Sequence, residues 1–258
     1  MSTVDTLAPD YGIDAPGVIR NLFLAGGAAV LLWASKVLGW WPAAITVGPI
    51  RFELAPMGIA VGVVCLAMGV WMLWTSKVGK IRERERLLDR IPWTGSERVL
   101  DVGCGRGLML VGAAKRLTSG TATGIDIWQA EDLSGNRPEA PLENARREGV
   151  ADRVEVRTAD MRKIPFPNAT FDAVVSCAAI HNLYDEPDRA KAIREITRVL
   201  KPGGHAVIDD IRHGREYAAA FEAAGCAKVE SVGSPAAALF LGLLTWGSLR
   251  PATLKVLR

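Results

Sequence analysis

The chain has 258 residues, of which 49% are hydrophobic and 23% are charged, and its mean hydropathy is positive at +0.16. Its net charge of +3 and pI of 8.7 are low for a nucleic-acid-binding domain, in which a basic face raises the pI above 9, so we expect no nucleic-acid partner. The four cysteines, Cys65, Cys104, Cys177 and Cys226, form no C-x-x-C pair, so we expect neither a metal site nor a disulfide framework.

The first 17 residues carry three aspartates, Asp5, Asp10 and Asp14, and no basic residue. A secretory signal peptide begins with positive charge, so this segment does not resemble one. Residues 1–17 are therefore predicted to form a cytoplasmic tail.

Two apolar segments follow, Leu22 to Trp40 with the single charge of Lys36, and Leu54 to Trp74 with none. About 20 helical residues at ~1.5 Å each span the ~30 Å hydrocarbon core of a bilayer, so residues 18–76 are predicted to form a transmembrane hairpin. Gly58 and Gly62 form a G-x-x-x-G step that allows close helix packing. The alternative is a pair of buried core helices.

Basic residues crowd the exit of the second segment, whereas the loop between the two segments has only Arg51. These residues are Lys77, Lys80, Arg82, Arg84, Arg86 and Arg90. The positive-inside rule then places the following domain on the cytoplasmic side of the plasma (inner) membrane. Residues 77–92 are predicted to form an amphipathic linker helix with Ile81, Leu87, Leu88 and Ile91 as its apolar members. A solvated charged linker is the alternative.

The segment from Val99 to Gly107 predicts a buried strand, a tight glycine turn and a helix that begins at Leu108. A dinucleotide fingerprint, G-x-G-x-x-G, would need glycine at Leu108. The pattern present is D-x-G-x-G-x-G, in which Asp101 brings negative charge toward the ligand. Such a carboxylate repels a pyrophosphate and attracts an ammonium or a sulfonium, which favours S-adenosylmethionine as the cofactor.

From about Arg86 to Pro235 the chain resembles the class I S-adenosylmethionine-dependent methyltransferases, with a type 11-like domain. The resemblance implies that Asp126, at the end of the second strand, binds the ribose hydroxyls, and that Asp160 and Met161 hold the adenine. The remaining positions implied to line the cofactor site are Asp101, Gly103, Cys104, Gly105, Gly107, Ile127 and Cys177.

The fold expected for residues 93–258 is an α/β, doubly wound, mostly parallel seven-stranded sheet of the Rossmann-like methyltransferase type. Parallel strands are predicted to begin near Val99, Ala122, Val154, Phe171 and Ala206, with the turn Arg198 to Gly204 before the last of them. The resemblance adds a sixth strand near Lys228 to Val232 and an antiparallel strand near Thr253 to Leu257.

His181 follows the fourth strand, where the reacting group is expected, and is the predicted catalytic base. A base is needed only if the acceptor must lose a proton, and a structural role for His181 is the alternative. His213, with Arg212 and Tyr217, is equally suited to recognising an acceptor and to reacting. His205 is predicted to be structural.

Two segments depart from the usual pattern of the family. The polar loop from Trp128 to Pro138 is longer than expected and is either a lid or acceptor site or a solvated insertion. The apolar run from Ala236 to Trp246 is too short to span a bilayer. It either lies in the membrane interface or forms a buried strand or helix.

The sequence thus predicts a membrane-anchored methyltransferase that uses S-adenosylmethionine to methylate an apolar, lipid-like or small-molecule acceptor at the cytoplasmic face. Anchoring would concentrate enzyme and membrane-dissolved acceptor in one plane. Methylation of a membrane-associated protein is one alternative, and a non-catalytic S-adenosylmethionine-binding scaffold is another. No feature of the sequence indicates an oligomeric state.

Overall fold

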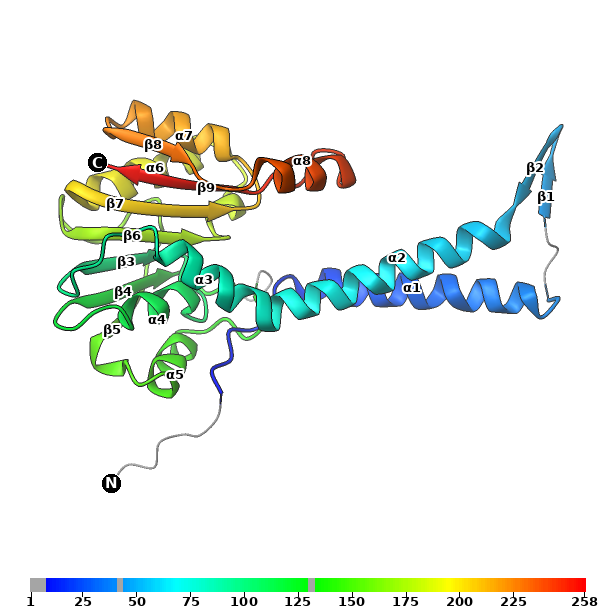
Figure 1. Ribbon diagram of the computed structural model, residues 1–258, viewed down its shortest axis with the longest axis horizontal. Helices are drawn as coiled ribbons and strands as arrows, with labels where there is room; N and C mark the ends of the chain where they lie inside the picture. Colours follow the sequence, from blue (N-terminus) through cyan, green and yellow to red (C-terminus); the bar gives the residue numbers. More distant parts are fainter. Residues whose placement is uncertain (1–7, 41–43, 130–132) are drawn as a thin grey trace, which may run out of the picture. The chain divides into compact units, whose positions relative to one another are not determined.

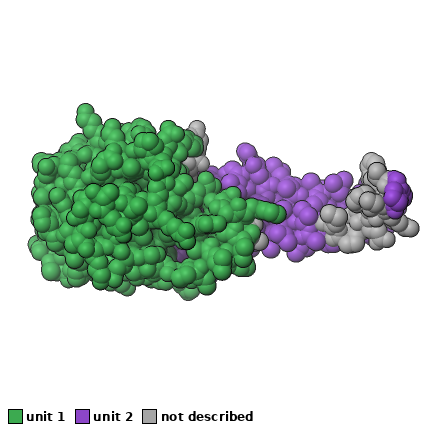
Figure 2. All heavy atoms as spheres, turned by 90° about the horizontal axis from the view of Figure 1, so that it is seen from above, with its two compact units in different colours: residues 1–11, 81–129, 135–258 green, residues 12–80, 130–134 purple. Residues whose placement is uncertain are grey.

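The computed structural model describes residues 8–40, 44–129 and 133–258. The described residues divide into two compact units (Figure 2). The sheet unit comprises the described parts of residues 1–11, 81–129 and 135–258, and the hairpin unit those of residues 12–80 and 130–134.

The hairpin unit contains two long helices that lie side by side, α1 (Pro16–Val37) and α2 (Leu54–Trp74) (Figure 1). Helix α1 begins six residues before the predicted segment, because Pro16 suits the first turn of a helix. The short strands β1 (Ala44–Val47) and β2 (Ile50–Glu53) pair between the helices, and a π-helical turn, Thr75–Gly79, follows α2. Residues 41–43 of the predicted link lie outside the described residues.

Glycines bring α1 and α2 close together. A Cβ atom on Gly62 would lie 2.7 Å from Cγ2 of Val30, and one on Gly26 would lie 2.8 Å from Cγ of Leu66. The close approach expected at Gly62 is therefore present, with Gly26 as an unpredicted counterpart. At Gly58 the nearest atom would be 3.6 Å away, which is ordinary contact.

The sheet unit is built on a seven-stranded sheet with the order β5-β4-β3-β6-β7-β9-β8. Neighbouring strands from β5 to β7 are parallel, and β9 runs antiparallel to both of its neighbours. The strands are β3 (Arg98–Val102), β4 (Thr121–Asp126), β5 (Val154–Thr158), β6 (Phe171–Cys177), β7 (Leu200–Asp210), β8 (Lys228–Ser231) and β9 (Ala252–Leu257). The predicted fold, and the predicted starts of the first four strands, are confirmed.

Strand β7 begins earlier than predicted. Phe171 of β6 pairs with Leu200, but Ala173 pairs with His205, so the residues between Leu200 and His205 bulge out of the ladder. The bulge is held by the end of β9, because Gly203 N–H donates to Arg258 O at 2.8 Å. The predicted turn from Arg198 to Gly204 is therefore partly the end of a helix and partly a bulge within a strand.

Helices cover both faces of the sheet (Figure 1). Side chains from α3 (Lys80–Leu88), α4 (Leu108–Ala114) and α5 (Glu139–Arg147) contribute to one core cluster, and those from α6 (Glu186–Val199) and α7 (Gly214–Ala223) to the other. Val99 packs in the first cluster and Leu100 in the second, as strand alternation requires. Helix α8 (Pro235–Leu244) connects β8 to β9.

Helix α3 packs its predicted apolar side chains, Leu87, Leu88 and the following Ile91, into the core, so a solvated linker is wrong for this segment. Arg84 on the same helix is also buried, although its place among the basic residues of the linker did not indicate this. Its guanidinium lies 3.0 Å from the Glu148 carboxylate, and both groups bond to the Tyr11 hydroxyl. Breaking a buried ion pair by removing one partner typically costs about 3–5 kcal/mol.

This ion pair predicts a dependence of stability on pH. Burial alone would raise the pKa of Glu148, but hydrogen bonds from Lys115, Tyr11 and Arg84 outweigh it and lower the pKa from 4.5 to about 2. The stabilisation is fully present above pH 4.5 and is lost as the pH falls toward 2, a loss of roughly 3 kcal/mol. Thermal unfolding in detergent at pH 6 and pH 3 should therefore differ more for the wild type than for Glu148→Gln. Glu143→Gln removes a more exposed carboxylate and should respond to pH as the wild type does. A wild-type response in Glu148→Gln as well would contradict the assignment.

Candidate functional site

The glycine loop after β3 is held in a conformation that needs glycine. Gly103, Gly105 and Gly107 all have positive φ, at 73°, 50° and 84°. A Cβ atom on Gly103 would lie 2.3 Å from Cβ of Ala179, which follows β6, and 3.7 Å from Cε of Met161, which follows β5. Loops after three parallel strands therefore meet at Gly103, at the carboxyl edge where ligands of such sheets bind.

Asp126 ends β4 beside this loop. One carboxylate oxygen accepts the Gly105 N–H at 2.8 Å, and the other accepts the Trp128 N–H at 2.6 Å. The side chain is half-buried, and a carboxylate has about four acceptor positions, so it retains capacity for hydroxyl donors. The next side chain, Ile127, is 48% exposed at the strand tip, where it offers an apolar surface.

Asp160, after β5, is engaged by an arginine that the sequence analysis did not consider. Arg162 approaches its carboxylate at 2.6 Å and also contacts Asp188 at 2.6 Å. Hydrogen bonds from Arg162 lower the pKa of Asp160, so it carries a negative charge at neutral pH. The neighbouring Met161 is the side chain of this pair that lies near the glycine loop.

The sequence analysis expected Asp101 to bring negative charge toward the ligand, and the structure corrects this expectation. The side chain is 1% exposed beneath the loop, and burial raises its pKa to about 8, so without a ligand it is mostly protonated at neutral pH. Its Oδ2 atom has no hydrogen-bond partner among the described residues. The carboxylates that reach the surface at this edge are those of Asp126 and Asp160, both half-buried, while Asp101 is a buried acid that an approaching cation would help to ionise.

The two cysteines of the predicted site have different surroundings. Cys104 is 5% exposed and packs against Gly124 of β4, where a Cβ atom would lie 2.7 Å from its Sγ, so its side chain belongs to the core. Only the backbone of Cys104 is available to a ligand. Cys177, at the end of β6, is half-buried, and its Sγ lies 3.9 Å from the Asp209 carboxylate. Burial raises the pKa of Asp209 to about 6.

His181 lies in a short 3₁₀ helix after β6, Ile180–Asn182, and is paired with Asp210 at the end of β7. Its Nδ1 is 2.6 Å from Asp210 Oδ1, and its backbone N–H donates to Oδ2 at 3.0 Å. Asp210 is 1% exposed and also accepts the Ile211 N–H at 2.8 Å and the Tyr217 hydroxyl at 3.3 Å. Because this carboxylate is surrounded by donors, it fixes the proton of the imidazole on Nδ1 and leaves Nε2 as an acceptor.

The turn that presents His181 is strained. Ala178 has φ 50°, which is uncommon for a residue with a Cβ atom, and its N–H donates to Asp209 O at 2.8 Å. Strained backbone of this kind costs about 1–3 kcal/mol and concentrates at functional sites. The strained turn after β6 is therefore a second indication that His181 has a functional role.

Asp210 is the site residue that the sequence analysis missed. The available signal was its place at the end of β7. Because β7 is the parallel neighbour of β6, Asp210 lies at the same edge of the sheet as His181, which follows β6. The prediction that Tyr217 helps to recognise an acceptor is wrong, because Tyr217 is 1% exposed in the core and cannot face an acceptor. His213 is half-buried at the start of α7, with Nδ1 3.2 Å from Glu216.

The long loop after β4 is described except at residues 130–132. Trp128 has φ 64°, and its indole N–H donates to Thr158 Oγ1 at 2.8 Å. Asn136 donates to the backbone oxygen of Gln129 at 3.1 Å. The role of this loop as a lid or acceptor site remains a prediction that falls partly outside the described residues.

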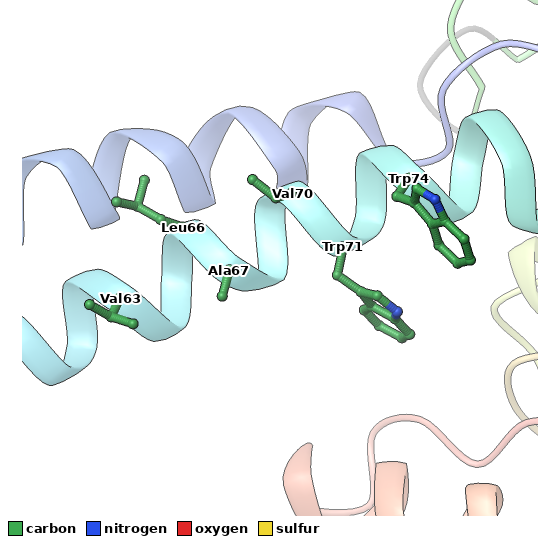
Figure 3. Close-up of a pocket in the computed structure, with 6 residues that line it drawn as sticks. All are labelled: Val63, Leu66, Ala67, Val70, Trp71 and Trp74. Carbon is green, nitrogen blue, oxygen red and sulfur yellow. The ribbon is translucent and has the colours of Figure 1, made fainter.

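An apolar hollow in the hairpin unit is separate from these residues. It is lined by α2 alone (Figure 3), through Val63, Leu66, Ala67, Val70, Trp71 and Trp74. It contains no titratable side chain, so it offers no chemistry beyond apolar contact.

Residues 100–208 match the family described as "Methyltransferase domain". An uncharacterized methyltransferase of Mycobacterium bovis, Mb0092, is 32% identical over 151 residues, which cover 55% of this chain and 68% of that protein. A demethylmenaquinone methyltransferase of Lactiplantibacillus plantarum is 34% identical over 125 residues, 48% of this chain and 49% of that protein. Two other curated relatives are matched over 43% and 44% of their lengths, so the chain spans less than half of them.

Among solved structures, the geranyl diphosphate C-methyltransferase of Streptomyces coelicolor has a TM-score of 0.52 at 19% identity. The match covers 68% of this chain and 74% of that one. That structure contains S-adenosyl-L-homocysteine, Mg²⁺ and geranyl-S-thiolodiphosphate. At this level of identity the likeness concerns the fold.

Proposed function

The chain belongs to the S-adenosylmethionine-dependent methyltransferases, and from that premise we propose that it is anchored in a membrane and methylates an apolar small molecule dissolved there. The observation that carries the proposal is the presence, in one chain, of the site around Gly103 and His181 and of two exposed apolar helices.

The site has the groups that S-adenosylmethionine requires. Asp101 supplies a buried acid beneath a turn of three glycines, with one oxygen that has no partner in the described part of the chain, and Asp126 supplies an acceptor for ribose hydroxyls. Ile127 and Met161 supply apolar surface for the adenine, with Asp160 beside them. When bound, the cofactor supplies an electrophilic methyl group on a sulfonium. The protein contributes mainly by aligning the acceptor with that methyl group, an effect worth up to ~7–11 kcal/mol.

We assign His181 as the base for an acceptor that loses a proton. Its Nε2 takes the proton, and Asp210, which is bonded to Nδ1, stabilises the imidazolium that forms. Asp210 is thus a positioning residue. The hydrogen bond from Tyr217 and those from two backbone N–H groups keep its carboxylate in place.

Three features of the hairpin unit support a membrane anchor at residues 18–76. Helix α1 and the continuous helical stretch Gly58–Leu88, which includes most of α2, have apolar windows with mean hydropathy of 1.6 and 2.0, and both are long enough to cross a bilayer. Only 11% of each window is buried, whereas a core helix of a soluble protein is mostly buried. Trp40 and Trp74, near the ends of the helices, are 73% and 50% exposed, as expected in an aromatic belt.

The basic residues after α2 place the sheet unit on the cytoplasmic side in this proposal. Arg84 does not contribute to this surface charge, because it is buried against Glu148. Arg82, Arg86 and Arg90 remain in the same segment, and each basic group near an anionic surface gains ~1 kcal/mol.

An apolar acceptor follows from this location and from one relative. The Lactiplantibacillus plantarum protein acts, by its name, on demethylmenaquinone. A membrane-dissolved acceptor and an anchored enzyme meet in two dimensions, which raises their effective concentration without new contacts.

Mass spectrometry of lipid extracts from cells with and without the gene tests the proposal. We expect one class of apolar molecules to lose a methylene in mass when the gene is deleted. The wild-type gene should restore that mass, and a His181→Ala gene should not. Unchanged lipid extracts together with a methylated membrane protein would contradict the assignment of the acceptor.

A further inference from the structure

Helix α8 exposes apolar side chains that the site described above does not use. Leu239 and Phe240 are 65% exposed, Leu243 is 74% exposed, and Trp246, just after the helix, is 98% exposed. At about 100° per residue, the three helical positions fall on one stripe of the surface. Residues 231–249 contain no charged residue. A buried strand or helix is therefore the wrong reading of this segment.

Trp246 is exposed at a conformational cost. It has φ 52°, a left-handed conformation that is uncommon for a residue with a side chain. The turn is closed by the Gly247 N–H, which donates to Gly242 O at 2.6 Å. A nearly fully exposed indole beside an exposed apolar stripe is typical of a surface that contacts a partner or a membrane.

The helix lies at the edge of the sheet that carries His181. Strands β8 and β7 both run antiparallel to β9, so the carboxyl end of β8, where α8 begins to form, is at the carboxyl edge of β7 (Figure 1). The chain after α8 returns to the same place, because Arg250 N–H donates to Ile211 O at 2.9 Å and Ala252 pairs with Asp210. The chain after α8 thus contacts the end of the strand that carries the partner of His181, and the chain before α8 contacts the neighbouring β9 through Val232 N–H and Thr253 O.

We propose that α8 inserts its apolar stripe and Trp246 into the interface of a bilayer that contains anionic lipid. The insertion would hold the carboxyl edge of the sheet at the lipid surface, so that an apolar acceptor reaches His181 without crossing water. The inference rests on the proposed function and adds a third membrane contact, one that belongs to the sheet unit itself.

Charge favours a lipid surface as the occupant. Arg250 follows α8, its side chain lies next to Gly242 of the helix, and residues 231–258 contain no acidic residue. Arg212 and Arg215, which follow the end of β7, are exposed. An apolar stripe with Trp at its end and basic residues nearby is the pattern of an interfacial helix.

Quenching of tryptophan fluorescence by brominated lipid tests the inference. The full-length protein is reconstituted into vesicles of phosphatidylcholine and phosphatidylglycerol in equal parts, with bromine on the acyl chains. We expect part of the quenching in the wild type to disappear in Trp246→Phe and to persist in Trp93→Phe. Trp93 is a matched control, since it lies before β3 at the opposite edge of the sheet and donates to Leu88 O at 2.7 Å.

A second variant separates insertion from folding. Leu239→Asp combined with Leu243→Asp should remove the quenching of Trp246, while the Kd for S-adenosylmethionine stays within about twofold of the wild type. Equal quenching in the wild type and Trp246→Phe would overturn the inference. So would a dimer in detergent that Leu243→Asp dissociates, because it would assign the stripe to a second copy of the chain.

The same data distinguish this inference from the proposed anchor. Trp71 and Trp74 of α2 report the anchor through the quenching that remains in Trp246→Phe. If Trp246→Phe showed no quenching at all, the anchor would be refuted, whereas equal quenching in the wild type and Trp246→Phe would refute only the role of α8.

Discussion

Replacing Asp126 by alanine is expected to weaken S-adenosylmethionine binding by at least 100-fold and to leave the sheet folded. The carboxylate holds the glycine loop through Gly105 N–H and is the acceptor assigned to the ribose hydroxyls. Hydrogen bonds to a charged group contribute about 1.5–3 kcal/mol each, so the loss of two corresponds to a factor of about 100 or more in Kd.

Isothermal titration calorimetry of the full-length protein in detergent measures this effect. Asp126→Asn keeps one acceptor oxygen and should fall between the wild type and the alanine variant. Asp152 follows α5, and its carboxylate is 71% exposed. The Asp152→Ala variant should therefore bind S-adenosylmethionine as the wild type does. An unchanged Kd in Asp126→Ala would show that the ribose contact lies elsewhere.

Removing the imidazole of His181 is expected to lower kcat by about 10²- to 10⁴-fold, the usual contribution of a positioned base. Cofactor affinity should not change, because His181 acts on the acceptor. Asp210→Asn should also lower kcat, since an amide can donate to Nδ1 and so place the imidazole proton on Nε2, where it blocks proton transfer.

Release of S-adenosylhomocysteine in the presence of a membrane extract gives the rate, and calorimetry gives the cofactor Kd for the same samples. His205→Ala is the matched control, because it removes a histidine from the same strand as Asp210 but five residues before the carboxyl edge. If His181→Ala kept wild-type turnover, alignment alone would account for catalysis and His181 would have a structural role.

The sheet was predictable because its buried strands and glycine turn leave a strong local pattern. Asp101 to Gly107 and the apolar runs around Val174 and Val207 predicted where parallel strands lie along the chain, and the resemblance supplied the two final strands. The start of β7 was not predictable, because the bulge between Leu200 and His205 depends on hydrogen bonds from the distant end of β9.

The sequence predicted where the site lies better than it predicted the charge of the site residues. The residues at the strand ends gather at one edge, as expected, but charge depends on burial that the sequence does not reveal. Asp101 illustrates this, since its full burial raises its pKa to about 8. The pairing of His181 with Asp210 needed the order of β6 and β7, which places the two strand ends side by side.

Contacts between segments far apart in sequence explain most of the remaining surprises. Arg84 sits among the basic residues of a linker pattern, yet it is buried against Glu148, 64 positions later. Gly26 has no motif of its own and is needed because Leu66 of α2 packs against it. The enzyme class and the cofactor are confirmed by the methyltransferase relatives, while the membrane anchor and the role of His181 stay predictions.

Transfer of a tritiated methyl group from S-adenosylmethionine by the purified full-length protein tests the central claim most directly. The protein is mixed with a membrane fraction, and the label is counted separately in the organic extract and in the precipitated protein. We predict label in the organic extract, absent with Asp126→Ala and reduced by at least 100-fold with His181→Ala. Label confined to the protein precipitate, or no label from a protein that binds the cofactor, would contradict the account.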